Sequence, residues 1–414
     1  MERIILHSDI NSCYASIEHA VRPELDGMPV AVGGSVEARH GIILAKDELA
    51  KRCGVRTGMV IWQAKQLCPE LIVLPPRMDL YMQYSKRAQE IYSDYTNLRE
   101  PFGIDESWLD VTGNIKYSDG LLVANEIKRR IKNELGITVS IGVSWNKVFA
   151  KLGSDYKKPD AITNISRDNF RDLVWPQPVE NLLYVGRATS ARLRSYGIAT
   201  IGELARADPE FLHASLGLNG YTVHAFANGR DLSPVRCCES SVPVKSVSNS
   251  TTTPRDMLCD EDVRSTLMAL TESVASRLRE FHCRGRCISL SLRSSALQWR
   301  SHQMKLPRST NITKEIFQCG LELFRQMHSW PSPIHSIGIC VSELVSDLYP
   351  QQTDLFGEDT RRVRQERLDR GIDTLRDKYG YACVRRGFFE FNSYSTASGE
   401  APRAMPLCSL PGCH

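Results

Sequence analysis

Three carboxylates in two strand-like segments are the residues best suited to chemistry in this chain. Asp105 and Glu106 lie side by side in the otherwise apolar run 102–111, and Asp9 ends the short strand-like run 3–9. Unpaired carboxylates in an apolar setting are costly, and adjacent like charges add repulsion. Divalent cations remove that cost, and Mg²⁺ prefers hard oxygen ligands. The three acids therefore predict a site that holds a pair of metal ions and catalyses phosphoryl transfer.

Each acid also has a plainer interpretation. An aspartate at the end of a strand is commonly a turn former or a helix cap, because its side chain bonds nearby backbone N–H groups. Adjacent residues of a regular strand point to opposite faces, so Asp105 and Glu106 share a site only if the chain bends there. Gly103, just before them, permits such a bend.

Composition describes a globular protein of several units. The chain has 414 residues, 42% hydrophobic and 24% charged, with a formal net charge of +4. That length predicts three or four units, and the mild positive charge permits an acidic partner without demanding one. The 13 cysteines include no CxxC pair, and the sequence contains no membrane-length apolar run. These features predict reduced thiols, no membrane association and a cytoplasmic location.

Periodicity predicts an α+β protein made of successive modules. The first module is predicted to have strands at 29–34, 41–45, 71–74, 102–111 and 137–143 and helices at 11–21, 48–53, 61–67, 79–95 and 119–135. This order predicts a split βαβ layer with the acids on its central strands. An all-helical stretch follows from 167 to 232, then a βαββαβ module from 244 to 341, a helix at 360–379 and a tail from 392 that looks disordered.

Basic side chains gather in three places outside the acids. Lys158 precedes Pro159, where the chain leaves a helix in an extended form, and its ammonium could reach a triphosphate. Gly186 and Arg187 open a short helix whose free N–H groups suit a phosphate. Strands of the βαββαβ module carry cations among serines and threonines, which suits contacts to a nucleic-acid backbone. Solvent-exposed helix and strand faces carry similar charges, so charge alone does not distinguish a binding site from an ordinary exposed face.

Five motifs in order resemble those of Y-family DNA polymerases of the DinB, or DNA polymerase IV, kind. They are Asp9 to Ala15, Ile104 to Asp110, Gly142 to Pro159, the Val185-Gly186 hairpin and Lys245 to Thr253. The resemblance runs from Arg3 to about Glu343, and the complete ordered set is highly specific.

The resemblance implies a multidomain right-hand architecture. The ferredoxin-like palm would be residues 1–10 and 78–166, with small fingers at 11–77. A helical thumb with a helix-hairpin-helix would cover 167–233, a linker 234–240 and the βαββαβ little finger 241–345. Residues 346–414 would hold a clamp-binding peptide, a helix and a flexible tail.

It also implies roles for particular residues. Asp9 and Asp105 would bridge two Mg²⁺ ions, with Mn²⁺ as a possible replacement, Glu106 would complete the catalytic site and the Ile10 carbonyl would add a ligand. Tyr14 would be the steric gate that excludes a ribose 2′-hydroxyl. The other implied contacts are the dNTP (Lys51, Lys158), the roof over the nascent base pair (Ile42, Leu44, Gly58), DNA (Gly186, Arg187, Lys245, Arg293, Arg300) and a sliding clamp, the β subunit (Gln352, Leu355, Phe356).

Several positions depart from the family pattern. Glu48 and Lys51 stand where a tyrosine and an arginine usually bind the triphosphate. Lys51 keeps a positive charge there, whereas Glu48 would repel phosphate unless its side chain turns away. Tyr184 replaces the first glycine of the thumb hairpin. Ile42 and Leu44 are bulkier than the usual roof residues, which predicts poorer tolerance of bulky template adducts.

The main hypothesis is an error-prone, monomeric, template-directed DNA polymerase that binds primer-template DNA and dNTPs, lacks proofreading and acts in translesion synthesis and DNA repair. A second is a catalytically weakened relative that serves as a clamp-bound repair accessory, which Glu48 keeps open. A nucleotide cyclase on a similar palm ranks last, because it would need neither the helical hairpin nor the basic module.

Overall fold

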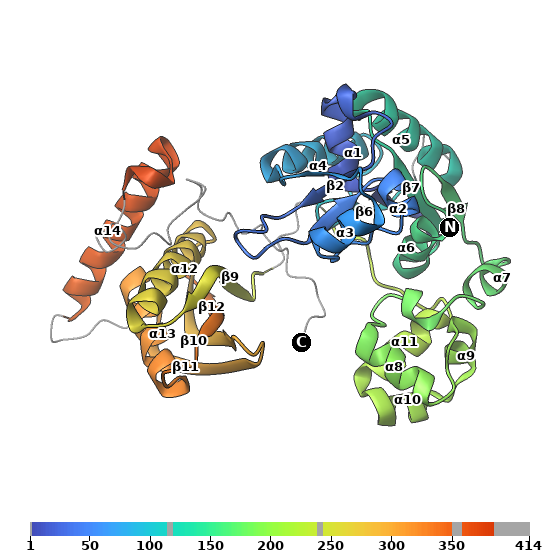
Figure 1. Cartoon of the computed structure of the whole chain (residues 1–414). Coiled ribbons are helices and arrows are strands. Elements are labelled where there is room, and N and C mark those ends of the chain that lie inside the picture. Colours follow the sequence, from blue (N-terminus) through green and yellow to red (C-terminus); the bar gives the residue numbers. More distant parts are fainter. Residues whose placement is uncertain (1, 114–118, 238–242, 350–357, 385–414) are drawn as a thin grey trace. The chain divides into compact units, whose positions relative to one another are not determined.

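The computed structural model describes residues 2–113, 119–237, 243–349 and 358–384. The chain divides into two compact units, made of the described residues of 1–34 with 41–241 and of 35–40 with 242–409. Each unit is described by itself (Figure 1). No helix in these described ranges is long and apolar enough to cross a membrane.

The acids lie on a five-stranded sheet in the first unit. Its strand order is β5 (Arg99–Phe102), β6 (Glu106–Asp110), β1 (Ile5–Ile10), β7 (Val139–Ser144) and β8 (Ile162–Asn164). The central strand β1 runs antiparallel to both β6 and β7. The prediction that the acids occupy central strands is therefore confirmed for Asp9 on β1 and Glu106 on β6, whereas Asp105 lies in the turn before β6.

The acid-bearing run 102–111 is not the single strand that the sequence predicted. It contains the end of β5, a turn over 103–105 and the strand β6. Gly103 has a φ of 86°, a left-handed conformation that most side chains disfavour. The glycine turn changes the direction of the chain immediately before the two acids.

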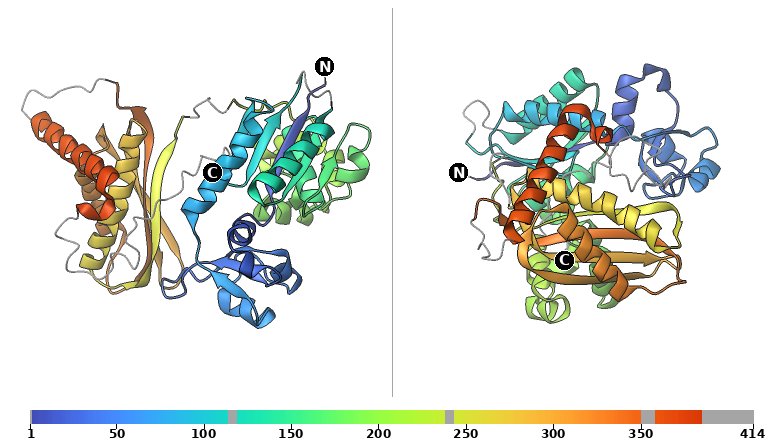
Figure 2. Two further views of the ribbon diagram at one scale, coloured as in Figure 1. Left: turned by 90° about the horizontal axis from the view of Figure 1, so that it is seen from above. Right: turned by 90° about the vertical axis from the view of Figure 1, so that its left-hand side faces the viewer.

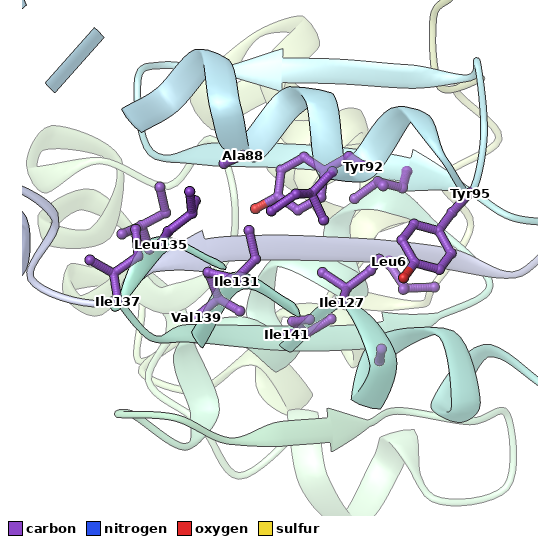
Figure 3. Packing of buried hydrophobic residues seen from close by; sticks show 14 of the residues in the cluster. Leu6, Ala88, Tyr92, Tyr95, Ile127, Ile131, Leu135, Ile137, Val139 and Ile141 are labelled. Atoms are coloured by element: carbon purple, nitrogen blue, oxygen red, sulfur yellow. The ribbon is translucent and has the colours of Figure 1, made fainter. Parts of the chain in front are cut away.

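One face of this sheet packs against helices α4 (Met78–Ser93) and α5 (Gly120–Leu135). Tyr92 of α4, Ile127 and Ile131 of α5 and Leu6 of β1 belong to one buried hydrophobic cluster (Figure 3). Helix α1 (Cys13–Val21) belongs to the same core through Cys13 and Ile17. The helix that follows β1 thus shares the core of this sheet.

Helix α6 (Lys147–Tyr156) covers the opposite face, and a glycine lets it come close. A Cβ atom at Gly142 of β7 would lie 1.9 Å from the Ala150 carbonyl oxygen, so no larger residue fits there. Phe149 near the start of α6 and Trp145, which precedes the helix, also belong to the hydrophobic core of the helical stretch that follows.

A small sheet and a helical cluster complete the first unit. The segment that the resemblance assigns to the fingers holds η1 (Pro23–Leu25) and the strand order β3 (Ile43–Lys46), β2 (Val30–Gly33), β4 (Ile72–Leu74), with α2 (Glu48–Arg52) and α3 (Ile61–Leu67). The stretch that the resemblance assigns to the thumb is helical, as predicted, with α7 (Phe170–Val174), η2 (Val179–Asn181), α8 (Arg187–Ser195), α9 (Ile201–Arg206), α10 (Pro209–Leu216) and α11 (Leu218–Ala227).

The second unit is the predicted βαββαβ module with one further helix. Its sheet has the order β11 (Trp299–Thr310), β10 (Cys283–Ser294), β12 (Ile334–Ser346), β9 (Ser246–Met257). Helices α12 (Asp260–Glu280) and α13 (Thr313–Met327) cover one face (Figure 2). Helix α14 (Glu358–Tyr379), followed by η3 (Tyr381–Cys383), docks on this helical layer through buried ion pairs, among them Arg279 with Asp373 at 2.5 Å.

Candidate active site

Strand register and the glycine turn bring the three acids together. Asp9 near the end of β1 lies directly opposite Glu106, the first residue of β6. Asp105 immediately precedes Glu106, and the Ile10 amide donates a hydrogen bond of 3.0 Å to the Asp105 carbonyl oxygen. The bend that a shared site requires is present, because the turn over 103–105 leads directly into Glu106.

Two lysines from α6 and the segment after it meet the acids from one side. Lys158 Nζ lies 2.7 Å from Asp9 Oδ2 and 2.8 Å from Asp155 Oδ1. Lys151 Nζ lies 2.5 Å from Glu106 Oε2. The predicted substrate contact Lys158 thus lies beside the acids, and Lys151 is an additional cation that the sequence analysis did not single out.

A buried histidine lies beneath Glu106. His7 of β1 is fully buried, and its Nδ1 is 2.8 Å from the Ser154 hydroxyl oxygen while its Nε2 is 3.4 Å from Glu106 Oε2. Burial lowers the pKa of His7. Strand alternation could have found this residue, because positions 7 and 9 share one face of β1.

The acids differ in how readily they ionise. Burial raises the pKa of Asp9 to about 7, with Lys158 opposing the rise and Glu106 adding to it. Burial and the Glu106 charge also raise the pKa of Asp105. Burial disfavours the ionised form of Glu106, but His7 and Lys151 outweigh it and lower the pKa to about 2.

This donor set fits a divalent cation in its chemistry. Three partly or fully buried carboxyl groups supply hard oxygen donors, and the raised pKa values of Asp9 and Asp105 reflect charge that the surroundings do not fully offset. In the described part of the chain, no group of three or more His, Cys, Asp or Glu side chains is already arranged around a metal position. Asp9 bonds Lys158 and Glu106 bonds Lys151, and the assignment of the three acids as metal ligands stays a prediction.

Tyr14 lies in the first turn of α1, just beyond the acid at the end of β1. It is half-buried, and its ring stacks on Tyr81 of α4 with 4.4 Å between ring centroids and 10° between planes. The loop between β1 and α1 is held at Asn11, whose amide donates to the Thr138 carbonyl oxygen at 3.0 Å. The fold therefore sets Tyr14 on a short, anchored connection from Asp9.

The predicted roof residues come together on one face of the fingers. Ile43 is fully buried, so its neighbours Ile42 and Leu44 point to the opposite face, where Ile42 is exposed. Gly58 donates its amide to the Ile43 carbonyl oxygen at 2.8 Å and has a φ of 81°.

Lys46 is a cation on the fingers that the sequence analysis missed. It follows Ile42 and Leu44 at the strand period of two, which was the available signal. Burial and the nearby Lys51 lower the pKa of Lys46. Lys51 itself lies 3.1 Å from Glu48, so Glu48 turns toward the cation in its own helix.

In the thumb, the predicted phosphate contacts lie at the exposed start of α8. Gly186 precedes the helix without a side-chain cap, and Arg187 is its first residue. Tyr184, the departure from the family pattern, adopts a φ of 69° that a glycine would adopt more readily.

Strand pairing in the second unit separates two predicted DNA contacts. Arg293 lies opposite Trp299 and shares its face of the sheet, with 5.6 Å from the guanidinium to the ring centroid. Arg300 lies opposite Leu292, which is buried under the helices, and burial together with the Arg300 charge lowers the pKa of His328, which follows α13. The two arginines therefore lie on opposite faces.

The open face of this sheet is rich in hydroxyl groups. Register places the following residues on the face of Arg293: Ser246, Ser248, Ser250, Thr252, Ser289, Ser291, Ser301, Gln303, Lys305 and Ser336. Lys245, the other predicted contact, is exposed and immediately precedes β9. The predicted clamp contacts Gln352, Leu355 and Phe356 lie outside the described residues.

Comparison with known proteins decides the family. Residues 8–155 match the impB/mucB/samB family and residues 244–355 match the C-terminal domain of that family. DNA polymerase IV of Acetivibrio thermocellus is 47% identical over 388 residues, which cover 94% of this chain and 97% of the relative. This chain belongs to the DNA polymerase IV group of the Y-family DNA polymerases.

Other relatives agree with this assignment. DNA polymerase IV of Pelotomaculum thermopropionicum is 38% identical, covering 92% of this chain and 94% of the relative. The solved Y-family DNA polymerase chimera Dbh-Dpo4(243-245)-Dbh matches with a TM-score of 0.73 at 21% identity, over 83% of this chain and 99% of that one, which shows the shared fold. The protein is a DNA-directed DNA polymerase of the translesion type, in a family that uses divalent metal ions.

Proposed function

We propose that this polymerase adds dNTPs to a primer 3′-hydroxyl by two-metal phosphoryl transfer, without proofreading and with low fidelity. The observation that supports the proposal most is the pairing of Asp9 with Glu106 across β1 and β6, with Asp105 in the adjoining turn. The three carboxylates lie at one end of neighbouring strands and have lysines beside them. This arrangement suits a reaction in which a negatively charged triphosphate must approach acidic side chains.

Each side chain then has a definite task. Asp9, Asp105, Glu106 and the Ile10 carbonyl would hold two Mg²⁺ ions, or Mn²⁺. When bound, the ions would favour the ionised primer hydroxyl and neutralise charge on the triphosphate and the leaving pyrophosphate. Lys158 would leave its 2.7 Å contact with Asp9 and bind a phosphate oxygen of the dNTP instead, because bound metal ions would then neutralise the Asp9 carboxylate.

Substrate selection would rest on the fingers and on α1. Tyr14 would act as the steric gate against a ribose 2′-hydroxyl, while Ile42, Leu44 and Gly58 would roof the nascent base pair. Lys51 would contact the triphosphate, and Lys46 would add a second cation that offsets Glu48.

Contacts with DNA would be mainly to the backbone. Gly186 and Arg187 at the start of α8, together with Lys245 and Arg293, would bind phosphates without reading sequence. Arg300 would reach DNA only around the edge of the sheet, because β11 turns it to the helix-covered side. A monomer acting in the cytoplasm, tethered to a sliding clamp through residues 352–356, completes the proposal.

Primer extension with Mg²⁺ and all four dNTPs tests this function. We expect the parent to extend the primer and Glu106→Ala to lose extension while still binding primer-template DNA. Asp110→Ala is the matched control, because Asp110 ends the same strand and pairs with Arg3 at 3.9 Å, away from the other acids. If the parent binds DNA but adds no nucleotide, the protein acts as a repair accessory, and the Glu48–Lys51 pair is the first place to look.

A further inference from the structure

A second tyrosine supports the ring of Tyr14. Tyr81 of α4 is fully buried and stacks nearly parallel to Tyr14, with 10° between the ring planes and 4.4 Å between centroids. A ring backed in this way cannot retreat from a bulky group on its other face without displacing the ring behind it. The position of Tyr14 therefore depends on what holds Tyr81.

A buried carboxylate holds Tyr81. The Tyr81 hydroxyl donates a hydrogen bond of 2.7 Å to Glu18 Oε1, and the Glu18 side chain is completely buried. Arg77, at the start of α4, donates from Nε to the same oxygen at 2.9 Å and from a terminal nitrogen to Oε2. Arg22 Nε adds a contact of 3.7 Å to Oε2.

The partners of the Glu18 carboxylate stabilise its charge and also join two helices. Burial disfavours the charge on Glu18, yet Arg77 and Tyr81 together lower the pKa of this carboxyl. Glu18 lies one helical turn after Tyr14 on α1, so its contacts with Arg77 and Tyr81 fasten the helix of Tyr14 to α4. Hydrogen bonds to a buried charge are among the strongest in proteins, and losing one partner is costly.

We propose that Glu18, held by Arg77, is a positioning residue for sugar selection: through Tyr81 it fixes the Tyr14 ring against which a ribonucleotide would collide. The inference rests on the proposed role of Tyr14 as the steric gate. Glu18 and Arg77 touch neither sugar nor metal in this scheme and act only through the stacked pair of rings.

Tyr81→Phe tests the inference with the smallest change. It keeps the stacked ring and removes only the bond to Glu18, whose contacts with Arg77 remain. We expect the ratio of kcat/KM for rNTP to kcat/KM for dNTP to rise roughly tenfold, the equivalent of one charge-assisted hydrogen bond. The readout is a ratio within one enzyme, so a general loss of active protein does not move it.

Tyr92→Phe is the matched control. Tyr92 is also buried on α4 and its hydroxyl bonds the Ser8 hydroxyl at 2.9 Å, but its ring does not stack on Tyr14. We expect its rNTP to dNTP ratio to equal that of the parent. An equal rise in both variants would overturn the inference, because loss of any buried hydroxyl would then explain the effect.

Two further variants separate this inference from the gate itself. Glu18→Gln keeps an acceptor for Tyr81 but loses the charge that binds Arg77, and we expect a smaller rise than in Tyr81→Phe. Tyr14→Ala removes the gate. If Tyr14→Ala leaves the ratio unchanged, the gate proposal fails. If Tyr14→Ala raises the ratio and Tyr81→Phe does not, the gate holds and the role of Glu18 is refuted.

Discussion

Replacing Asp9 by Asn should stabilise the metal-free polymerase at pH 8 while removing its activity. Burial raises the pKa of Asp9 from 3.8 to about 7. A carboxyl with a raised pKa in the folded state contributes its stability below the unfolded pKa and loses it as pH rises through the folded value. The parent should therefore lose stability between about pH 4 and pH 7, and Asp9→Asn should lose less.

The size of the effect follows from the same pKa. A rise from 3.8 to about 7, at 1.36 kcal/mol for each pH unit, corresponds to about 4 kcal/mol. Asp9 also binds Lys158, and the variant forfeits that contact, although Lys158 keeps Asp155 at 2.8 Å. We expect a net gain of about 1–3 kcal/mol at pH 8 and almost none at pH 4.5.

Urea unfolding in EDTA at several pH values between 4.5 and 8 measures this directly. Added Mg²⁺ should narrow the difference at pH 8, because a bound cation stabilises the folded parent by mass action. Asp110→Asn is the control in the neighbouring strand and should show no such pH-dependent gain. Equal unfolding free energies of Asp9→Asn and the parent at pH 8, or a less stable variant there, would refute the reasoning.

Three other outcomes follow from the geometry. Gly142→Ala should lower the free energy of unfolding in urea by about 3 kcal/mol or more, because the new methyl group would lie 1.9 Å from the Ala150 carbonyl oxygen. Gly371→Ala is the control: the space around Gly371 is open, so this variant should be as stable as the parent or more stable. Lys158→Met should raise KM for dNTP roughly tenfold in steady-state extension with a smaller change in kcat, and an unchanged KM would contradict its phosphate role. Leu44→Ala should improve extension past a bulky template adduct more than past a small lesion, and equal gains would show that the roof does not limit adduct size.

Local pattern alone determined most of the elements. The helix predicted at 61–67 is α3 (Ile61–Leu67), and the helix predicted at 119–135 is α5 (Gly120–Leu135). Helical and strand periods depend on residues a few positions apart, so they can be recognised from the sequence alone. The acids were predictable for a related reason: carboxylates in apolar strand-like runs are costly unless they serve a site.

Tertiary structure decided which of these residues meet. Arg293 and Arg300 look alike in sequence, but strand register places them on opposite faces, because a shift by one position reverses every side chain. Glu18 bonds Arg77 and Tyr81 across 59 and 63 positions of sequence, and no local period links them. The sequence by itself determined most of the elements and indicated the acids of this polymerase, but not the turn over 103–105 that divides the run 102–111. Only packing between distant segments decided how Tyr14 is supported, because the stacking of Tyr81 on Tyr14 requires α1 and α4 to lie against the same core.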